Sequence, residues 1–272
     1  MAFTQTHFRS ISLPSRLDQV SSKSLESELE KLKCGSGSSE SVQSGLVALA
    51  QLYNSVEEFT QKSAFHHQDE KSMEESLSQS VDLLDACSAI REVLQMMREN
   101  VHALQSAMRR KGTDSSVQND VAAYFSLRKK MQKTVAKTLK NLKKSESAII
   151  KSGSNQHSVS AEGDFSFVFR QIAGITIANF RSVLVFLSYA AARPSGWSLV
   201  SKFVAAKSGN DSDSVNEVEN LDLGLQGKMT SDVQKRLQVV DEIIEEFEGG
   251  LERLFRQLVQ TRVTLLNILT NQ

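Results

Sequence analysis

The sequence predicts an all-α protein, in which an elongated bundle of long antiparallel helices follows a disordered N-terminal tail. The first observation is that only two prolines occur in 272 residues, because a proline inside a helix costs about 3 kcal/mol. The second is that apolar residues recur at spacings of three and four over several long segments, which is the period of an amphipathic helix. The third is that 40% of the residues are hydrophobic, which is enough for one packed core at this length.

Residues 1–22 are predicted to form the tail, and residues 23–272 the bundle domain. The tail is rich in Ser and Thr and has arginines but no acid before Asp18, a composition that mimics an organelle transit peptide. Pro14 interrupts the segment, and no amphipathic stripe is present. We therefore favour a modifiable tail on a cytoplasmic protein over import into an organelle.

A short motif in the tail has the pattern R-S-x-S-x-P, which resembles a phosphoserine ligand of 14-3-3 proteins. A phosphate on Ser12 would offer charge and acceptor oxygens to an arginine cluster of the partner, and Pro14 would turn the chain away. Serine-rich tails also produce such strings by chance, and that alternative stays open. The candidate phospho-dependent partner site consists of Arg9, Ser10, Ser12 and Pro14.

Apolar spacing predicts two helices before residue 70. Leu25, Leu29 and Leu32 indicate a short helix. A longer amphipathic helix ends before His66, and its apolar positions are Val42, Leu46, Leu49, Leu52, Val56 and Phe59. Linkers are expected near 34–41, 112–116, 152–160, 193–197 and 208–214, where small and polar residues interrupt the apolar pattern.

The next helix is predicted to begin at a capping box, Ser72-Met73-Glu74-Glu75, and to end at Gly112 after three basic residues. Its apolar positions alternate in steps of four and three without a miss. They are Leu83, Cys87, Ile90, Leu94, Met97, Val101, Leu104 and Met108.

A third long helix is predicted from about Ser116 to Ser147. Its inward positions are Val117, Val121, Tyr124, Met131, Val135, Leu139 and Leu142. Its other face is expected to carry eight basic residues and no acid, namely Arg128, Lys129, Lys130, Lys133, Lys137, Lys140, Lys143 and Lys144. Lys133, Lys137, Lys140 and Lys144 form a stripe that is a candidate anion-binding surface.

The basic helix 128–144 allows several interpretations. It could meet an anionic membrane surface, an acidic protein or nucleic acid. It could also be neutralised inside the bundle, because residues 211–248 contain eleven acids and three bases. A formal net charge of zero excludes a uniformly basic binder, and the lack of aromatics among the lysines disfavours single-stranded nucleic acid.

Residues 172–192 are the most hydrophobic stretch and the one candidate for a transmembrane helix. Arg181 and Asn179 nearly cancel the favourable insertion energy of the apolar residues. We therefore favour a helix at the centre of a bundle.

The last helix, from about Thr230 to the end, carries a sustained heptad repeat, which demands a long partner helix. That partner can lie within the chain or in a homodimer, and both remain open. The two heptad series are Val233, Val240, Phe247, Leu254, Thr261 and Ile268, and Leu237, Ile244, Leu251, Leu258 and Leu265.

No catalytic or metal-binding signature is present. H-E-x-x-H, C-x-x-C and the phosphate-binding loop are absent, and the five histidines are scattered. Two cysteines suit a reducing compartment. We therefore predict a protein that is not an enzyme and takes no cofactor.

Five strings, taken in order, resemble the plant-specific family called domain of unknown function 241, which is often grouped with BYPASS-type proteins. They are Arg9-Ser10-Ile11-Ser12-Leu13-Pro14-Ser15-Arg16, Leu83-Leu84-Asp85-Ala86-Cys87, Pro194-Ser195-Gly196-Trp197-Ser198-Leu199-Val200-Ser201-Lys202, Gly250-Leu251-Glu252-Arg253-Leu254-Phe255-Arg256 and Thr261-Arg262-Val263-Thr264-Leu265-Leu266-Asn267-Ile268-Leu269. The resemblance implies an all-helical plant protein linked to root and shoot development. It supplies no catalytic residue.

One departure from the family pattern is the pair Gly249-Gly250, whose second glycine replaces a better helix former and puts the straightness of the last helix in doubt. With the composition, the resemblance leads us to expect a non-enzymatic regulatory protein that acts through protein–protein contacts. The alternative is a peripheral membrane protein that uses the basic helix 128–144.

Overall fold

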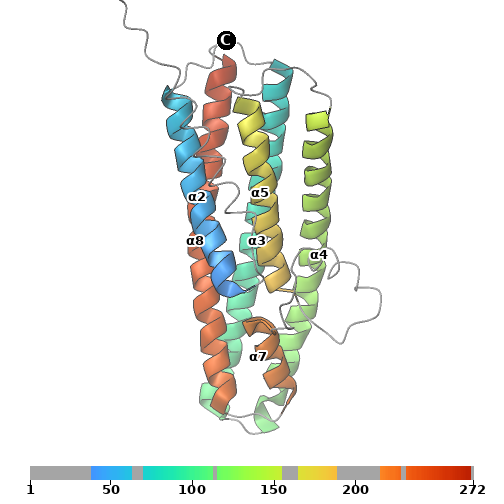
Figure 1. Ribbon diagram of the computed structural model, residues 1–272. Coiled ribbons are helices and arrows are strands. Elements are labelled where there is room, and N and C mark those ends of the chain that lie inside the picture. The colour runs from blue at the N-terminus through green and yellow to red at the C-terminus, as the bar shows by residue number, and fades with distance from the viewer. Residues whose placement is uncertain are drawn as a thin grey trace, which may run out of the picture.

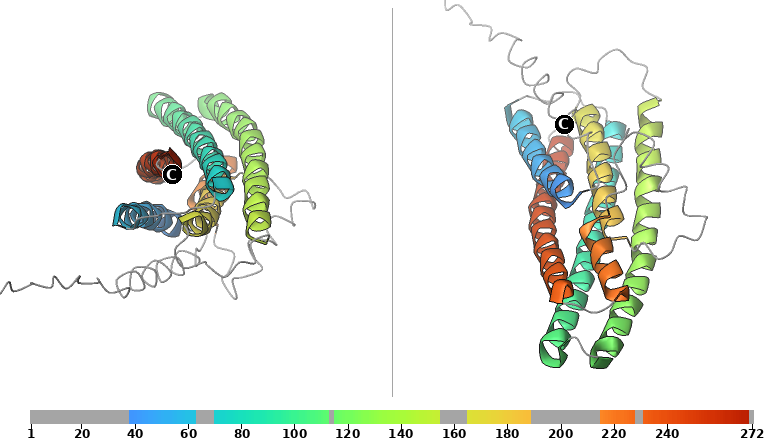
Figure 2. Two further views of the ribbon diagram at one scale, coloured as in Figure 1. Left: turned by 90° about the horizontal axis from the view of Figure 1, so that it is seen from above. Right: turned by 60° about the horizontal axis from the view of Figure 1, so that its bottom comes forward.

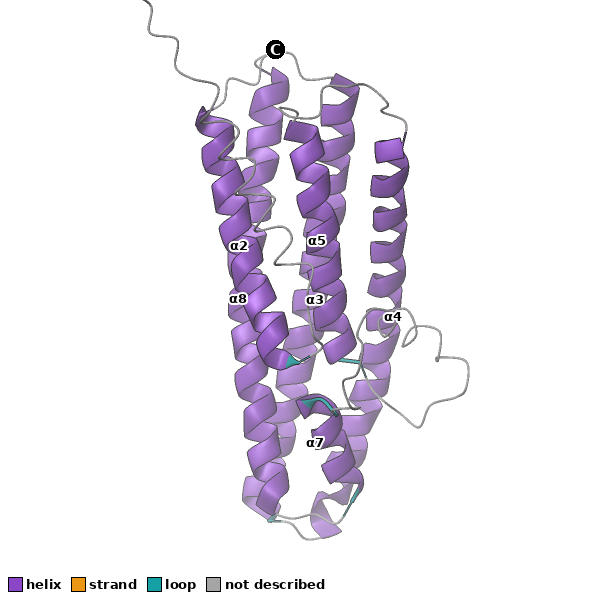
Figure 3. Ribbon diagram, in the orientation of Figure 1, coloured by secondary structure: helices purple, strands orange, loops and turns teal. Residues whose placement is uncertain are grey.

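The computed structural model describes residues 38–62, 70–112, 115–154, 165–188, 215–227 and 231–270. Within these ranges the chain forms helices and no strand (Figures 1 and 3), which confirms the predicted fold class. The elements are α2 (Ser39–Lys62), α3 (Glu70–Lys111), the short 3-10 helix η1 (Ser115–Val117), α4 (Gln118–Ser154), α5 (Phe165–Phe186), α7 (Glu217–Gln226) and α8 (Ser231–Thr270).

The two longest helices, α3 with 42 residues and α8 with 40, run antiparallel along the whole molecule. At one end of the molecule α2 and α5 complete a four-helix bundle with them (Figure 1). The short helix α7 packs on α8 beyond the end of α5. Helix α4 packs on α3 and α5, and Figure 2 shows it at the outside of the bundle.

The predicted apolar stripes form the core. All eight positions predicted in α3 are buried, and so are the predicted positions of α2 from Val42 to Val56. In α8 the heptad positions are buried from Val233 to Leu265, and α8 packs on α3, α2 and α7. The heptad seam is therefore occupied within the chain.

The ends of α3 differ in how well the sequence indicates them. Gly112 adopts a left-handed φ of 71°, and its N–H donates to Met108 O at 2.9 Å, as expected of a glycine that ends a helix. The predicted capping box is wrong, because α3 begins at Glu70 and Ser72 is a buried residue within the helix. The acid in the first turn favours this earlier start.

The hydrophobic stretch predicted at 172–192 corresponds to α5, which begins at Phe165 and ends at Phe186. The two polar residues that oppose membrane insertion, Arg181 and Asn179, both have partners in the bundle protein. Arg181 forms an ion pair with Glu146 of α4 at 2.6 Å, and Asn179 Nδ2 donates to Ile175 O at 3.0 Å. In the described part of the chain, no helix has the length and hydropathy needed to cross a membrane.

The two glycines of α8 have different surroundings, although the helix runs through both without a break. A Cβ on Gly250 would lie 3.1 Å from Cβ and Cδ1 of Leu46, whereas a Cβ on Gly249 would meet nothing within 4 Å. The second glycine therefore permits the close packing of α2 on α8.

This difference predicts that alanine at position 249 and alanine at position 250 change the free energy of unfolding differently. Gly249→Ala is expected to raise the free energy of unfolding by about 0.5–1 kcal/mol, because alanine is the better helix former. Gly250→Ala is expected to be at least about 1 kcal/mol less stable than Gly249→Ala, since buried Leu46 must move. Urea unfolding of the two variants measures the difference, and equal stabilities would contradict the close approach.

Candidate anion-binding surface

Helix α4 has one face turned into the bundle and the opposite face turned outward. The residues buried on the inner face, from Val117 to Leu142, recur every three or four positions. Six exposed lysines lie on the opposite side, within an arc of about 100° at 3.6 residues per turn. We call them the lysine face, and they are Lys129, Lys130, Lys133, Lys137, Lys140 and Lys144.

The structure places the predicted stripe on one surface of α4, as the helical spacing of its residues implies. Its members are Lys133, Lys137, Lys140 and Lys144. From Lys129 to Lys144 the lysine face covers about 23 Å at 1.5 Å per residue. None of the six lysines forms a hydrogen bond or an ion pair with another described residue. Their charges are therefore turned toward solvent.

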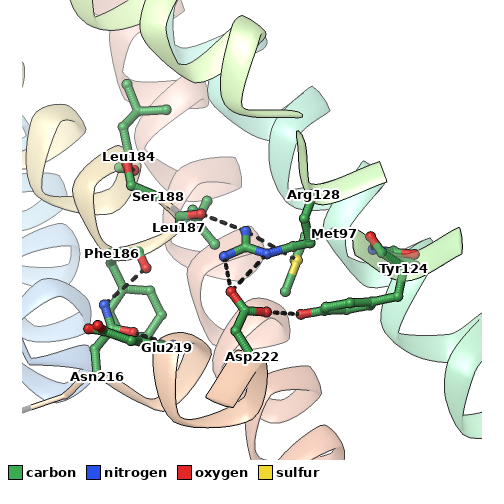
Figure 4. A network of polar contacts seen from close by, with 11 residues as sticks. Met97, Tyr124, Arg128, Leu184, Phe186, Leu187, Ser188, Asn216, Glu219 and Asp222 are labelled. Atoms are coloured by element: carbon green, nitrogen blue, oxygen red, sulfur yellow. Dashed lines mark hydrogen bonds and ion pairs between the residues drawn. The ribbon is translucent and has the colours of Figure 1, made fainter. Parts of the chain in front are cut away.

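The prediction that Arg128 lies on the exposed basic face is wrong, because its side chain is 1% exposed. Its guanidinium donates to Asp222 of α7, from Nη2 at 2.8 Å and from Nε at 3.3 Å, and to Leu187 O at 2.7 Å (Figure 4). The Tyr124 hydroxyl donates to the other oxygen of Asp222 at 2.8 Å. Arg128 stands in the apolar register between Tyr124 and Met131, and that spacing was the available signal for its burial.

The contacts of Arg128 join three elements at one point. Helix α5 ends there. Its last carbonyl, Phe186 O, accepts a hydrogen bond from Asn216 Nδ2 at 3.2 Å, and the next carbonyl, Leu187 O, accepts from Arg128. Asn216 is also the N-cap of α7 and accepts from the Glu219 N–H. Both charges are saturated by structural partners, so this cluster holds α4, α5 and α7 together.

Four acidic residues of α8, Asp241, Glu245, Glu248 and Glu252, pair with α3 rather than with α4. Arg98 contacts Asp241, Glu245 and Glu248 at 3.6, 3.5 and 2.6 Å. His102 Nε2 lies 2.8 Å from Asp241. The prediction that the acidic residues 211–248 neutralise the basic helix is therefore wrong for the six lysines. It is correct for Arg128, which pairs with Asp222.

Each segment outside the described ranges has a small net charge. Residues 189–214 contain three basic and two acidic residues, and residues 1–37 contain five basic and four acidic residues. The strongest net negative charge is that of residues 155–164, with two acids and no Lys or Arg. No one of these segments carries enough net negative charge to balance six lysines by itself.

A shallow groove of about 710 Å³ lies between α3 and α8. Its lining includes Arg91 and Glu252, which form an ion pair at 2.5 Å, and Glu248, which pairs with Arg98. No group of three His, Cys, Asp or Glu side chains suited to a metal ion occurs among the residues described. These charges stabilise the packing of α3 on α8.

Two buried titratable groups of the core, Tyr53 and Cys87, favour their neutral forms. Burial raises the pKa of Cys87 to about 12, and burial also raises the pKa of Tyr53, whose hydroxyl lies 2.9 Å from Thr176 Oγ1. Such a thiol is protonated at neutral pH and behaves as a small core side chain.

The predicted phospho-dependent site at Arg9, Ser10, Ser12 and Pro14 lies outside the described residues, and so do the linkers predicted at 193–197 and 208–214. The 14-3-3 ligand therefore stays a prediction. The stripe of Lys133, Lys137, Lys140 and Lys144 lies within the described residues, and its binding of anions also stays a prediction.

The helices and their contacts define an all-α bundle protein with a cationic outer helix. A family model described as Protein BPS1 matches residues 45–268. The chain belongs to the BPS1 family, which confirms the resemblance to BYPASS-like plant proteins. Comparison with curated proteins and comparison with solved structures found no match.

Proposed function

We propose that this BPS1-family protein is a non-enzymatic regulatory protein whose lysine face holds it against an anionic membrane surface. The observation that supports the proposal is that six exposed lysines, without partners in the described chain, occupy the side of α4 opposite its packing face. An ammonium group is a compact hydrated charge that needs no fixed geometry to be attracted. A planar anionic leaflet can therefore meet all six lysines together.

The composition of the lysine face favours a lipid surface over a protein helix. The exposed positions among the lysines include Ala136 and Asn141, and no large apolar side chain stands there. A partner helix would gain no apolar seam, and exposed ion pairs alone contribute about 0–1 kcal/mol each. A basic residue near an anionic leaflet contributes about 1 kcal/mol. Six lysines then give a dissociation constant of roughly tens of micromolar, which is a reversible attachment.

Fractionation of plant cells tests this function. Tagged wild type is expected in the membrane pool at low salt and in the soluble pool after a high-salt wash, because salt screens surface charges. The variant Lys133→Gln, Lys137→Gln, Lys140→Gln and Lys144→Gln is expected in the soluble pool throughout. Wild type that is soluble at low salt would refute the membrane role.

A second candidate, contact with protein partners, is favoured by a row of exposed apolar residues on α8. Val259, Val263 and Leu266 are 41%, 42% and 40% exposed, and they follow Phe255, which lies under the Arg91 guanidinium at 5.3 Å. Exposed apolar rows of this kind are typical of protein interfaces. Such contacts would suit the link with root and shoot development that the resemblance implies.

Affinity purification tests the second candidate. The variant Val259→Gln with Val263→Gln is expected to lose partners that wild type retains, while its circular dichroism stays unchanged. An unchanged set of partners would remove the α8 row from the proposal.

A further inference from the structure

We infer that Ser147 is a phosphorylation site at which an added phosphate releases the lysine face from the membrane. The inference rests on the proposed function, because it assigns a control to the same surface. Ser147 is exposed and follows Lys144 by three residues and Lys140 by seven. Residues at these spacings are neighbours on one side of a helix. A phosphate there would lie among the lysines.

The hydroxyl of Ser147 is free of contacts with other helices. Its Oγ donates to Lys143 O at 2.8 Å, one turn earlier in the same helix. Modification therefore breaks a local bond and leaves the packing of α4 on α3 and α5 in place.

The end of α4 is held less firmly than the rest of the helix, which gives an enzyme access to Ser147. Its ties to the bundle include the half-exposed Glu146–Arg181 ion pair, the Ser145–Asp82 hydrogen bond and the partly buried Ile149, and exposed pairs contribute only about 0–1 kcal/mol each. Up to Leu142 a buried side chain occurs in every turn, but no residue from 143 to 151 is buried. Ile150 is 67% exposed. Segments with few buried apolar contacts open locally at low free energy. These last turns can therefore unwind into the extended form that a protein kinase binds.

Other hydroxyls of α4 lack this combination. Ser145 Oγ donates to Asp82 Oδ2 of α3 at 3.1 Å, and Thr138 is buried. Ser126 is exposed but stands between Tyr124 and Arg128, which the buried cluster holds. Among the hydroxyls of α4 from Ser126 to Ser147, Ser147 thus lies both beside the lysines and in the loosely held turns.

The reaction is an ordinary phosphoryl transfer from ATP, bound by a serine kinase that selects basic residues before its target. The Ser147 oxygen attacks the γ-phosphorus and forms the new O–P bond, the bond from that phosphorus to the ADP oxygen breaks, and the hydroxyl proton passes to a carboxylate of the kinase. The product carries a charge of about −1.5 to −2 at neutral pH. That charge offsets nearly two of the six lysines.

Vesicle binding of the full chain with phosphoserine placed at position 147 tests the inference. The matched control carries phosphoserine at Ser55 of α2, whose Oγ makes the same bond to the carbonyl one turn earlier, at Gln51. With vesicles of phosphatidylcholine and phosphatidylserine, phosphorylation at 147 is expected to weaken binding about twenty-five-fold. Each offset lysine charge weakens binding about five-fold, and the phosphate offsets about two charges. Phosphorylation at 55 is expected to change binding less than about three-fold, because α2 lies on another side of the bundle from α4 (Figures 1 and 2) and salt screens charges that are far apart.

Each outcome decides a separate point. Unmodified protein that prefers anionic vesicles, together with a 147-phosphorylated form that binds equally well, would overturn the inference and keep the proposed function. Unmodified protein without that preference would overturn both.

Amide hydrogen exchange tests whether a kinase can reach Ser147 in the folded protein. The amides of residues 143–151 are expected to exchange at least about ten-fold faster than those of residues 121–142. Equal protection of the two segments would contradict modification of the folded protein.

Discussion

Asp222→Ala is expected to lower the free energy of unfolding by about 3–5 kcal/mol. The change removes the carboxylate that pairs with Arg128, whose side chain is 1% exposed, and the acceptor of the Tyr124 hydroxyl. A buried charge deprived of its partner keeps its desolvation cost without the compensating attraction. Urea unfolding followed by far-UV circular dichroism measures the loss.

Two further variants make this result specific. Asp232→Ala removes the partner of Arg236 in an exposed pair at 2.7 Å and is expected to cost less than about 1 kcal/mol. Arg128→Met combined with Asp222→Leu removes both charges and is expected to be more stable than Asp222→Ala alone. Equal effects of Asp222→Ala and Asp232→Ala would show that the buried cluster does not hold α7 to α4.

The four-lysine variant is expected to bind anionic vesicles near a thousand-fold more weakly than wild type. Lys133, Lys137, Lys140 and Lys144 each contribute about 1 kcal/mol near an anionic leaflet, and about 4 kcal/mol corresponds to that factor. Glutamine keeps the helix propensity of lysine, so the fold should be unaffected. Vesicle sedimentation at low salt gives the two dissociation constants.

Two double variants of equal net charge show whether vesicle binding depends on the lysine face or on the total charge of the protein. Lys133→Gln with Lys140→Gln is expected to weaken vesicle binding about thirty-fold. Lys71→Gln with Lys235→Gln removes two exposed lysines from α3 and α8 and is expected to have little effect. Equal losses would mean that binding follows the total charge and not the lysine face.

The sequence predicts the helices well because each one buries a continuous apolar stripe. The spacing of leucines, valines and isoleucines identifies α2, α3, α4 and α8, and Gly112 marks the end of α3. The start of α3 was missed because Ser72 and Glu75 offer a good local cap, whereas the structure continues the helix back to Glu70. Helix ends fray, so a local cap signal locates a helix start only to within one or two residues.

The partners of charged residues are less predictable, since they depend on which helices pack together. Arg128 and Asp222 are 94 residues apart, and no spacing rule connects them. The opposite net charges of the basic helix 128–144 and of residues 211–248 suggested mutual neutralisation. The chain instead packs α4 on α3 and α5, which leaves the lysines outside.

The surroundings of single residues also differ in how far the sequence predicts them. The register of α4 could have placed Arg128 inside, because it continues the spacing from Tyr124 to Met131. Gly250 could not have been interpreted from the sequence, because its reason is the approach of Leu46 from another helix.

Lysine footprinting on membranes tests the central claim most directly. The full chain is acetylated with a lysine-reactive reagent in the presence of phosphatidylserine vesicles or of phosphatidylcholine vesicles, and mass spectrometry gives the rate at each lysine. The six lysines of the lysine face are expected to be protected by the anionic vesicles alone, while Lys71 and Lys235 react equally in both. Equal rates for the six lysines on the two kinds of vesicle, or protection at Lys71 and Lys235 instead, would contradict the assignment of this face.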